Sequence, residues 1–100
     1  MIQHIVMFKM QVFDNQNEKI GVLNKIKSEL ESLSSKISQI KSIEAGINMI
    51  HSERAFDLVL VATFNSLEDL KIYADHPEHQ KIVTLIRQYS EKAISVDYEK

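Results

Sequence analysis

The sequence predicts an α+β fold in which helices cover one face of a four-stranded antiparallel sheet. Four segments are rich in apolar and β-branched residues, and apolar side chains alternate within them at the period of a strand. Two further regions repeat apolar residues every three or four positions, as amphipathic helices do. Along the chain these segments follow the order β-α-β-β-α-β.

The first half of the chain predicts a strand followed by a long helix. Residues 2–11 alternate, but both strand faces carry apolar groups, so we expect this strand to be covered on both sides. The polar cluster 14–17 can cap a helix over residues 16–37, and the serines near its end indicate a weak last turn. The helix is predicted by apolar residues at helical spacing: Ile20, Leu23, Ile26, Leu30, Leu33 and Ile37.

The middle of the chain predicts a β-hairpin. Residues 42–50 alternate, and Gly46 marks either a weak position or a bulge. A polar connection over residues 51–55 leads into residues 56–64, which are rich in strand-forming residues. Because a short connection joins the two segments, we expect antiparallel pairing.

The last third predicts a broken helix and a final strand. Ser66 is a good N-cap, with Asp69 three residues later. The helix that follows is interrupted at His76, because a residue before proline is pushed out of the helical region. Pro77 is well placed in the first turn of a second helix, and a strand is expected over residues 93–98.

This order is the split βαβ, ferredoxin-like pattern. Helices should cover one face of the sheet, and a bare apolar face of that size usually marks an interface. We therefore expect a homodimer in which two sheets face each other and close an α/β barrel. The candidates for the bare face are Val6, Phe8, Leu58, Leu60 and Ala62.

Composition narrows the functional classes. The chain has 100 residues, which fits one domain over residues 1–100, and its net charge is −2 with no basic run, unlike a nucleic-acid binder. It has no cysteine, so disulfides and thiolate chemistry are excluded. No apolar run is long enough to cross a membrane, no signal peptide is recognisable, and two glycines cannot make a phosphate-binding loop. We expect a cytoplasmic protein that binds neither nucleic acid nor membranes.

Two stretches resemble a known family. His4 to Lys9 resembles the opening strand of the stress-responsive dimeric α/β-barrel (Dabb) family, and Tyr73 to His79 resembles its Y-x-x-H-P-x-H segment. Residues 62–70 also fit the way in which that family enters its second helix. Together with the element order, the resemblance covers essentially the whole chain.

The resemblance implies candidate site residues. A plant member of the family cyclises a linear polyketide with a tyrosine–histidine pair and no cofactor or metal. By position its catalytic tyrosine and histidine match Tyr73 and His79, and its opening-strand histidine matches His4. The position of a further pocket histidine in that relative is occupied by Leu58 here. This difference argues against the same substrate and chemistry in this chain.

Each candidate also has a structural interpretation. His4 lies on an apolar strand face, either lining a ligand pocket with Val6, Phe8, Leu58 and Leu60 or as a core histidine satisfied by one hydrogen bond. His79 lies in the first turn of a helix, which favours the neutral imidazole that a general base requires, but it could simply hold the helix start. Tyr73 could orient a substrate or serve as a core aromatic.

The remaining histidines predict less. We expect His76 to be structural, as a cap at the helix break, and His51 to be solvated in the hairpin loop. His4, His76 and His79 could together bind zinc, but no carboxylate is clearly placed to complete the set. We therefore expect no metal and no cofactor.

Three functions remain open. The leading hypothesis is a homodimer that binds a small organic molecule in an apolar pocket. The second is cofactor-independent acid–base chemistry of the cyclase, isomerase or lyase type, with His79 as base, Tyr73 as positioning group and His4 as pocket partner. The third is a stress-protective oligomer without a ligand. Fold alone does not separate them.

Overall fold

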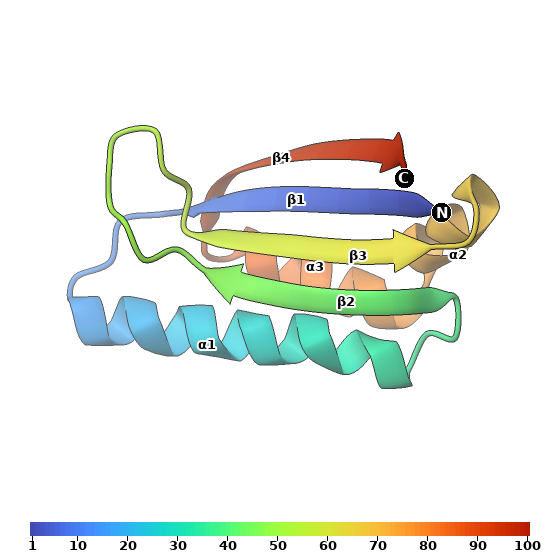
Figure 1. Ribbon diagram of the computed structural model, residues 1–100. Helices are drawn as coiled ribbons and strands as arrows, with labels where there is room; N and C mark the ends of the chain where they lie inside the picture. The colour runs from blue at the N-terminus through green and yellow to red at the C-terminus, as the bar shows by residue number, and fades with distance from the viewer.

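A computed structural model describes residues 1–100 and contains one four-stranded antiparallel sheet (Figure 1). Its strands are β1 (Ile2–Met10), β2 (Ile40–Ile47), β3 (Leu58–Phe64) and β4 (Ser90–Glu99), in the spatial order β2-β3-β1-β4. The first strand therefore pairs with both the third and the fourth. This arrangement confirms the predicted ferredoxin-like fold.

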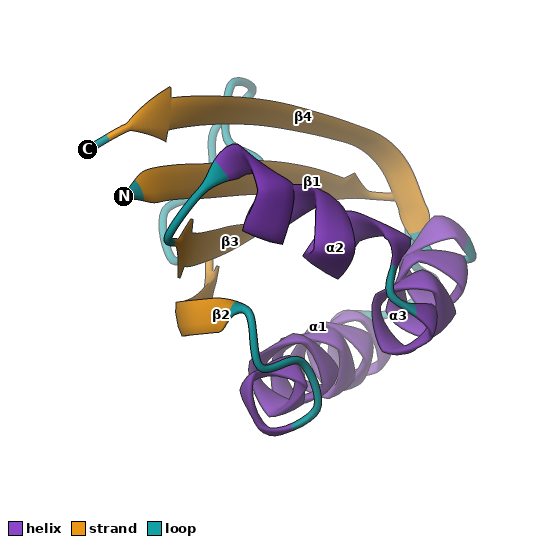
Figure 2. Cartoon of the chain, turned by 90° about the vertical axis from the view of Figure 1, so that its right-hand side faces the viewer, coloured by secondary structure: helices purple, strands orange, loops and turns teal.

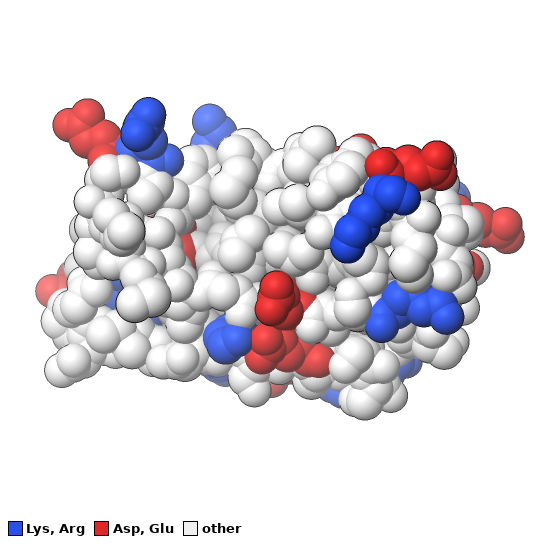
Figure 3. All heavy atoms as spheres, in the orientation of Figure 1, with Lys and Arg blue, Asp and Glu red and all other residues white.

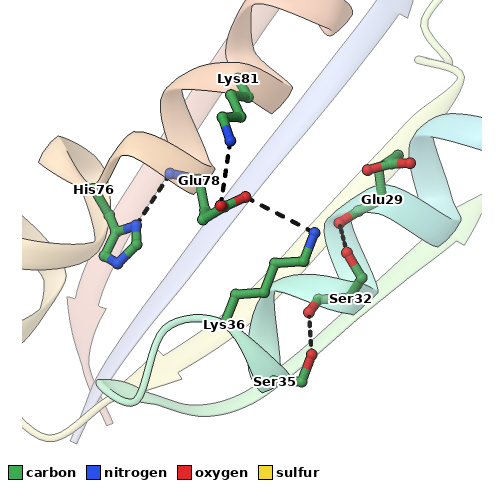
Figure 4. Close-up of polar contacts among 7 residues, drawn as sticks. All are labelled: Glu29, Ser32, Ser35, Lys36, His76, Glu78 and Lys81. Atoms are coloured by element: carbon green, nitrogen blue, oxygen red, sulfur yellow. Dashed lines mark hydrogen bonds and ion pairs between the residues drawn. The ribbon is translucent and has the colours of Figure 1, made fainter.

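The helices lie on one side of the sheet (Figure 2). They are α1 (Gln16–Ser32), α2 (Leu67–Asp75) and α3 (Pro77–Arg87). The Asn15 side chain caps α1 by accepting a hydrogen bond from the Glu18 backbone at 2.7 Å. The α-helix ends earlier than predicted, because residues 33–35 tighten into the 3₁₀ turn η1 (Leu33–Ser35). Serine hydroxyls donate to nearby carbonyls there (Figure 4), as side chains that compete with the helical ladder do.

The break between α2 and α3 is built from a cap and a proline. The Ser66 hydroxyl accepts from the Asp69 backbone at 3.1 Å and starts α2. His76 has extended backbone angles, and its Nδ1 accepts from the Glu78 backbone at 3.1 Å (Figure 4). Pro77 occupies the first position of α3, where its missing N–H is harmless. The predicted structural role of His76 is therefore confirmed.

The core lies between the sheet and the helices, and it corrects one prediction. The five residues expected on the bare sheet face instead point toward the helices: Phe8, Leu58, Leu60 and Ala62 are buried and Val6 packs against them. The register explains why these residues share one face of the sheet, since Val6 is paired with Leu60 and Phe8 with Leu58. Alternation had correctly placed these residues on one face, but on the wrong side of the sheet.

The open face of the sheet is apolar in its middle, but it is made of the opposite set of residues. Polar side chains share this face, among them Gln3, Lys9 and Thr63, which explains why the helices pack on the other one. Figure 3 shows a broad area without charged side chains across the middle of this face. Its apolar members are Ile5, Met7, Val59, Val61, Ile94, Val96 and Tyr98.

Several strand ends also differ from the prediction. Strand β2 ends at Ile47, and Met49 lies in the hairpin loop with 89% of its surface exposed. The irregularity in its pairing with β3 falls between Ile40 and Ser42, not at Gly46. Strand β4 extends over Ser90–Glu99, longer than the apolar alternation alone indicated, because its polar residues pair with β1 as well.

Candidate functional site

An apolar cavity of about 310 Å³ lies between α3 and the β1–β4 half of the sheet. One wall is a stripe of α3 side chains at helical spacing, which runs from His79 through Ile82, Val83 and Ile86 to Arg87. The opposite wall comes from paired strands, with Val6 opposite Ser95 and Phe8 opposite Ala93. The remaining lining residues are His4, Leu30, Leu60, Ser90 and Ile94.

The cavity exists because the helices do not cover the fourth strand. Every residue of β4 after Ser90 is exposed, whereas Leu58 and Leu60 on the central strand β3 are buried. Helix α3 thus lies beside the β4 edge of the sheet without packing closely against it. The volume is at the lower end of the range for small-molecule sites.

His79 is held in one orientation at the start of α3. Its Nδ1 lies 2.9 Å from the carbonyl oxygen of Ala74, in the last turn of α2. Because a carbonyl oxygen can only accept, Nδ1 donates, and Nε2 of the neutral ring is left with its lone pair. Burial lowers the pKa of His79, the Ala74 hydrogen bond opposes this, and the charges of His4 and His76 lower it further. The site therefore favours a neutral imidazole with one free basic nitrogen.

His4 is oriented by a carboxylate on the neighbouring strand. Its Nδ1 pairs with Oδ1 of Asp97, which lies directly opposite in the β1–β4 register. Since a carboxylate oxygen accepts, a ring proton is held on Nδ1, and Nε2 makes no hydrogen bond within the chain. The His4 side chain is largely buried, with 15% of its surface exposed. Carboxylate and imidazole form an oriented pair at the same end of the cavity as His79.

Tyr73 lies in the core and packs against both histidines. Its ring centroid lies 4.4 Å from that of His79 and 6.0 Å from that of His4, and it packs on Phe64 at 4.9 Å. The residue is 1% exposed, and its buried hydroxyl has no hydrogen-bond partner. Burial raises the pKa of the phenol, so Tyr73 stays protonated and can act only as a neutral donor or acceptor.

The structure brings most of the predicted site residues together. His4, Val6, Phe8, Leu60 and His79 line the same cavity, and Tyr73 contacts both histidines without lining it. Their roles in ligand binding or catalysis stay predictions. Leu58, the first residue of β3, is buried in the core and does not line the cavity. The zinc alternative finds no support in the geometry, since no group of three or more His, Asp or Glu side chains is placed to hold a metal ion.

Sequence reasoning missed two polar residues of this site. Asp97 was not proposed, because its position opposite His4 depends on the pairing of the first and last strands. Arg87 was not proposed either, although its spacing of eight residues from His79 on one helix was a usable signal. Once the helix is set, residues separated by seven or eight positions share a face.

A larger hollow of about 580 Å³ lies at the other end of the sheet, among the loops that follow β1 and β2. Its lining is mostly polar and includes His51, which is exposed as predicted. The carboxylate of Asp57 there is already satisfied by Lys19 at 2.9 Å and by the Met10 backbone at 2.7 Å. We therefore favour the smaller apolar cavity as the functional site.

No helix of the structure is both long and apolar enough to span a bilayer.

Comparison with known proteins agrees with this architecture. Residues 2–100 match the Stress responsive A/B Barrel Domain family. The chain is 30% identical over 100 residues to the stress-response A/B barrel domain-containing protein DABB1 of Arabidopsis thaliana, covering 97% of this chain but only 46% of that protein. It is 29% identical to an uncharacterised protein of Streptomyces coelicolor, covering 99% of both chains.

Solved structures show the same fold. A dimeric ferredoxin-like protein of unknown function from Bacteroides fragilis is 37% identical, with a TM-score of 0.89, and the match covers 99% of this chain and 95% of that one. A hydroxynitrile lyase from Passiflora edulis shares the fold at 17% identity, with a TM-score of 0.79 over 97% of this chain and 90% of the lyase. The family match spans every strand and helix described above. The chain therefore belongs to the stress-responsive A/B barrel domain family.

Proposed function

We propose that this protein binds a small, mainly apolar organic molecule in the cavity between α3 and the β1–β4 edge. The observation that carries the proposal is the composition of that cavity: an apolar lining closed at one end by two oriented histidines. Ligand sites typically combine an apolar wall with a few convergent polar groups in this way. The polar hollow at the other end lacks that character.

The binding proposal is tested by filling each hollow in turn. Ala93 lines the apolar cavity and Ala55 lines the polar hollow, so Ala93→Phe and Ala55→Phe make a matched pair. Benzylacetone, a small aromatic ketone, is titrated by calorimetry into the wild type and both variants. We expect binding to the wild type and to Ala55→Phe, and a loss of at least tenfold in affinity with Ala93→Phe. Equal binding to all three proteins would overturn the assignment of the cavity.

The state of His79 favours a second candidate function, cofactor-independent proton transfer. A neutral imidazole with a free nitrogen can remove a proton next to a carbonyl. Tyr73 packs on His79 from the core side, and His4 is held by Asp97 at the same end of the cavity. In this proposal His79 is the base, Tyr73 the positioning group that packs on it and His4 a pocket partner.

Deuterium exchange tests this chemistry directly. In heavy water a base that removes a proton beside the ketone of benzylacetone would replace it with deuterium, with no net change in the ketone. We expect exchange above the buffer rate with the wild type and none with His79→Asn, whose amide nitrogen can still donate to Ala74. Exchange that is unchanged in His79→Asn would contradict the role of this residue, while leaving ligand binding in place.

We also propose that two copies pair through their open sheet faces. The apolar middle of that face is unlike the surface of most monomers, and a hollow of about 420 Å³ with a mainly apolar lining opens on it beside Met7 and Val59. The related protein from Bacteroides fragilis is dimeric. Such pairing would close the barrel and leave the candidate cavity on the helix side of each copy.

A further inference from the structure

We propose that Arg87 anchors the carboxylate of the ligand, so that the cavity selects small apolar molecules carrying an acid group. This inference rests on the proposed function, because it names the class of molecule that the same cavity takes. It concerns the end of the cavity opposite to the histidines.

The first argument is charge. Arg87 is the only Lys or Arg that lines the cavity, and no Asp or Glu lines it. Its exposed guanidinium makes no hydrogen bond and no ion pair within the chain, so its donors are free to bind a ligand. A guanidinium presents a planar pair of donors that matches a carboxylate, so an acid group is the natural partner for an unpaired one beside an apolar space.

The second argument is spacing. His79 and Arg87 lie eight residues apart on α3, which places them about 12 Å apart along the helix axis. On the facing wall His4 and Phe8 lie four residues apart on β1, or about 13 Å. The two walls therefore run in parallel between a histidine end and an arginine end. A short apolar body would have its acid group at the arginine end and its other end beside the histidines.

The third argument is position on the helix. A cation in the last turn of a helix also stabilises the partial negative charge there, which would account for an arginine without any ligand. That role requires only a charge near the helix end. It does not require the side chain to continue the stripe of Ile82, Val83 and Ile86 along the cavity, as Arg87 does.

The test compares two probes of nearly equal shape. Hydrocinnamate and benzylacetone share the same skeleton, and a carboxylate oxygen in one replaces a methyl group in the other. Affinities are measured by calorimetry at neutral pH and low salt with the wild-type protein and Arg87→Gln. Lys81→Gln is the control, because it removes a positive charge from the same helix without touching the cavity.

We expect hydrocinnamate to bind the wild type more tightly than benzylacetone, and Arg87→Gln to weaken hydrocinnamate about fivefold or more. Benzylacetone should bind Arg87→Gln as it binds the wild type, Lys81→Gln should change neither affinity, and Arg87→Lys should give an intermediate value. Methyl resonances of Ile82 and Ile86 should shift on binding of either probe.

The outcomes separate this inference from the proposed function. If benzylacetone binds and shifts these methyl groups while Arg87→Gln leaves hydrocinnamate unaffected, the anchor is wrong and the cavity function stands. If Arg87→Gln weakens both probes equally, Arg87 acts only on the structure of the helix end, and the anchor is again overturned. If neither probe binds, both proposals fail.

Discussion

At the scale of single residues, the site is defined by which polar atoms are satisfied. His79 and His4 each have one ring nitrogen fixed by a protein acceptor, whereas the hydroxyl of Tyr73 is buried and unpaired. A buried polar group without a partner costs free energy that an apolar replacement would recover. Such a cost is typical of groups retained for function rather than for stability.

The hydroxyl of Tyr73 should therefore destabilise the fold. We expect Tyr73→Phe to raise the free energy of unfolding by about 1 kcal/mol, since it removes a buried, unpaired hydroxyl and keeps the ring packing. Urea unfolding measures this, with Tyr89→Phe as control, because Tyr89 is only partly buried and stacks on Phe13. A clear loss of stability in Tyr73→Phe would mean that the hydroxyl bonds to a protein group or to water.

The lowered pKa of His79 makes a prediction about pH. Well above pH 6.5, the ordinary pKa of a histidine, His79 is neutral in both the folded and the unfolded chain and contributes nothing to the pH dependence. As the pH falls below that value, the unfolded chain takes up the proton first, so stability is lost until the folded-state pKa is passed. We expect His79→Asn to reduce this acid-side slope of the unfolding free energy. An unchanged slope in His79→Asn would contradict the lowered pKa of His79.

At the scale of elements, the joint between α2 and α3 positions the basic group. The carbonyl of Ala74 in the last turn of α2 accepts from both His79 and Gln80, while His76 caps the start of α3. Glu78, the second residue of α3, also forms an ion pair with Lys36, which lies beyond the end of α1 (Figure 4). The distance between Glu78 Oε2 and Lys36 Nζ is 3.8 Å. The orientation of His79 thus depends on a helix break that proline imposes.

The cap at this joint can be tested separately from the chemistry. We expect His76→Ala to lower the free energy of unfolding by about 1 kcal/mol, because it removes the acceptor for the Glu78 backbone. His76→Asn should keep most of the stability, since asparagine is a good N-cap. Thermal or urea unfolding of both variants gives the comparison. Equal losses in the two variants would show that the imidazole acts by more than capping.

The elements also show what could be predicted from the sequence. Periodicity identified every strand and helix, and turn chemistry located the caps at Ser66 and His76, because these signals are local. Which face of β1 the helices cover was predicted wrongly, since apolar residues occupy both. The polar side chains of Gln3, Lys9 and Thr63 on the opposite face were the signal that should have decided it.

For the site, the resemblance to a family pointed to His4, Tyr73 and His79, and the structure places them near one another. The partner of His4 could not be predicted, because Asp97 lies 93 residues away and meets it only through strand register. The open cavity could not be predicted either. It depends on how far α3 stands from β4, which no local pattern encodes.

At the scale of the whole molecule, the two faces of the sheet differ in what covers them. One face packs on the helices and holds the cavity, and the other leaves apolar side chains in solvent. Gln3 on the open face also has a buried side-chain oxygen without a partner in the single chain. A surface of this kind is stabilised when a second copy covers it, and a small domain gains the most from such cover.

Dimerisation through the open face should therefore be sensitive to one charge within its apolar area. Val96 on β4 lies opposite Ile5 and is 52% exposed, and Ile20 on the outer side of α1 is 47% exposed. We expect the wild type and Ile20→Asp to be dimers by sedimentation, and Val96→Asp to be a folded monomer, because a carboxylate buried between two apolar sheets would be strongly destabilising. A dimer that persists in Val96→Asp with unchanged affinity would place the interface elsewhere. Circular dichroism of each variant separates loss of pairing from loss of fold, and benzylacetone titration of the monomer would then show whether the helix-side cavity needs the partner at all.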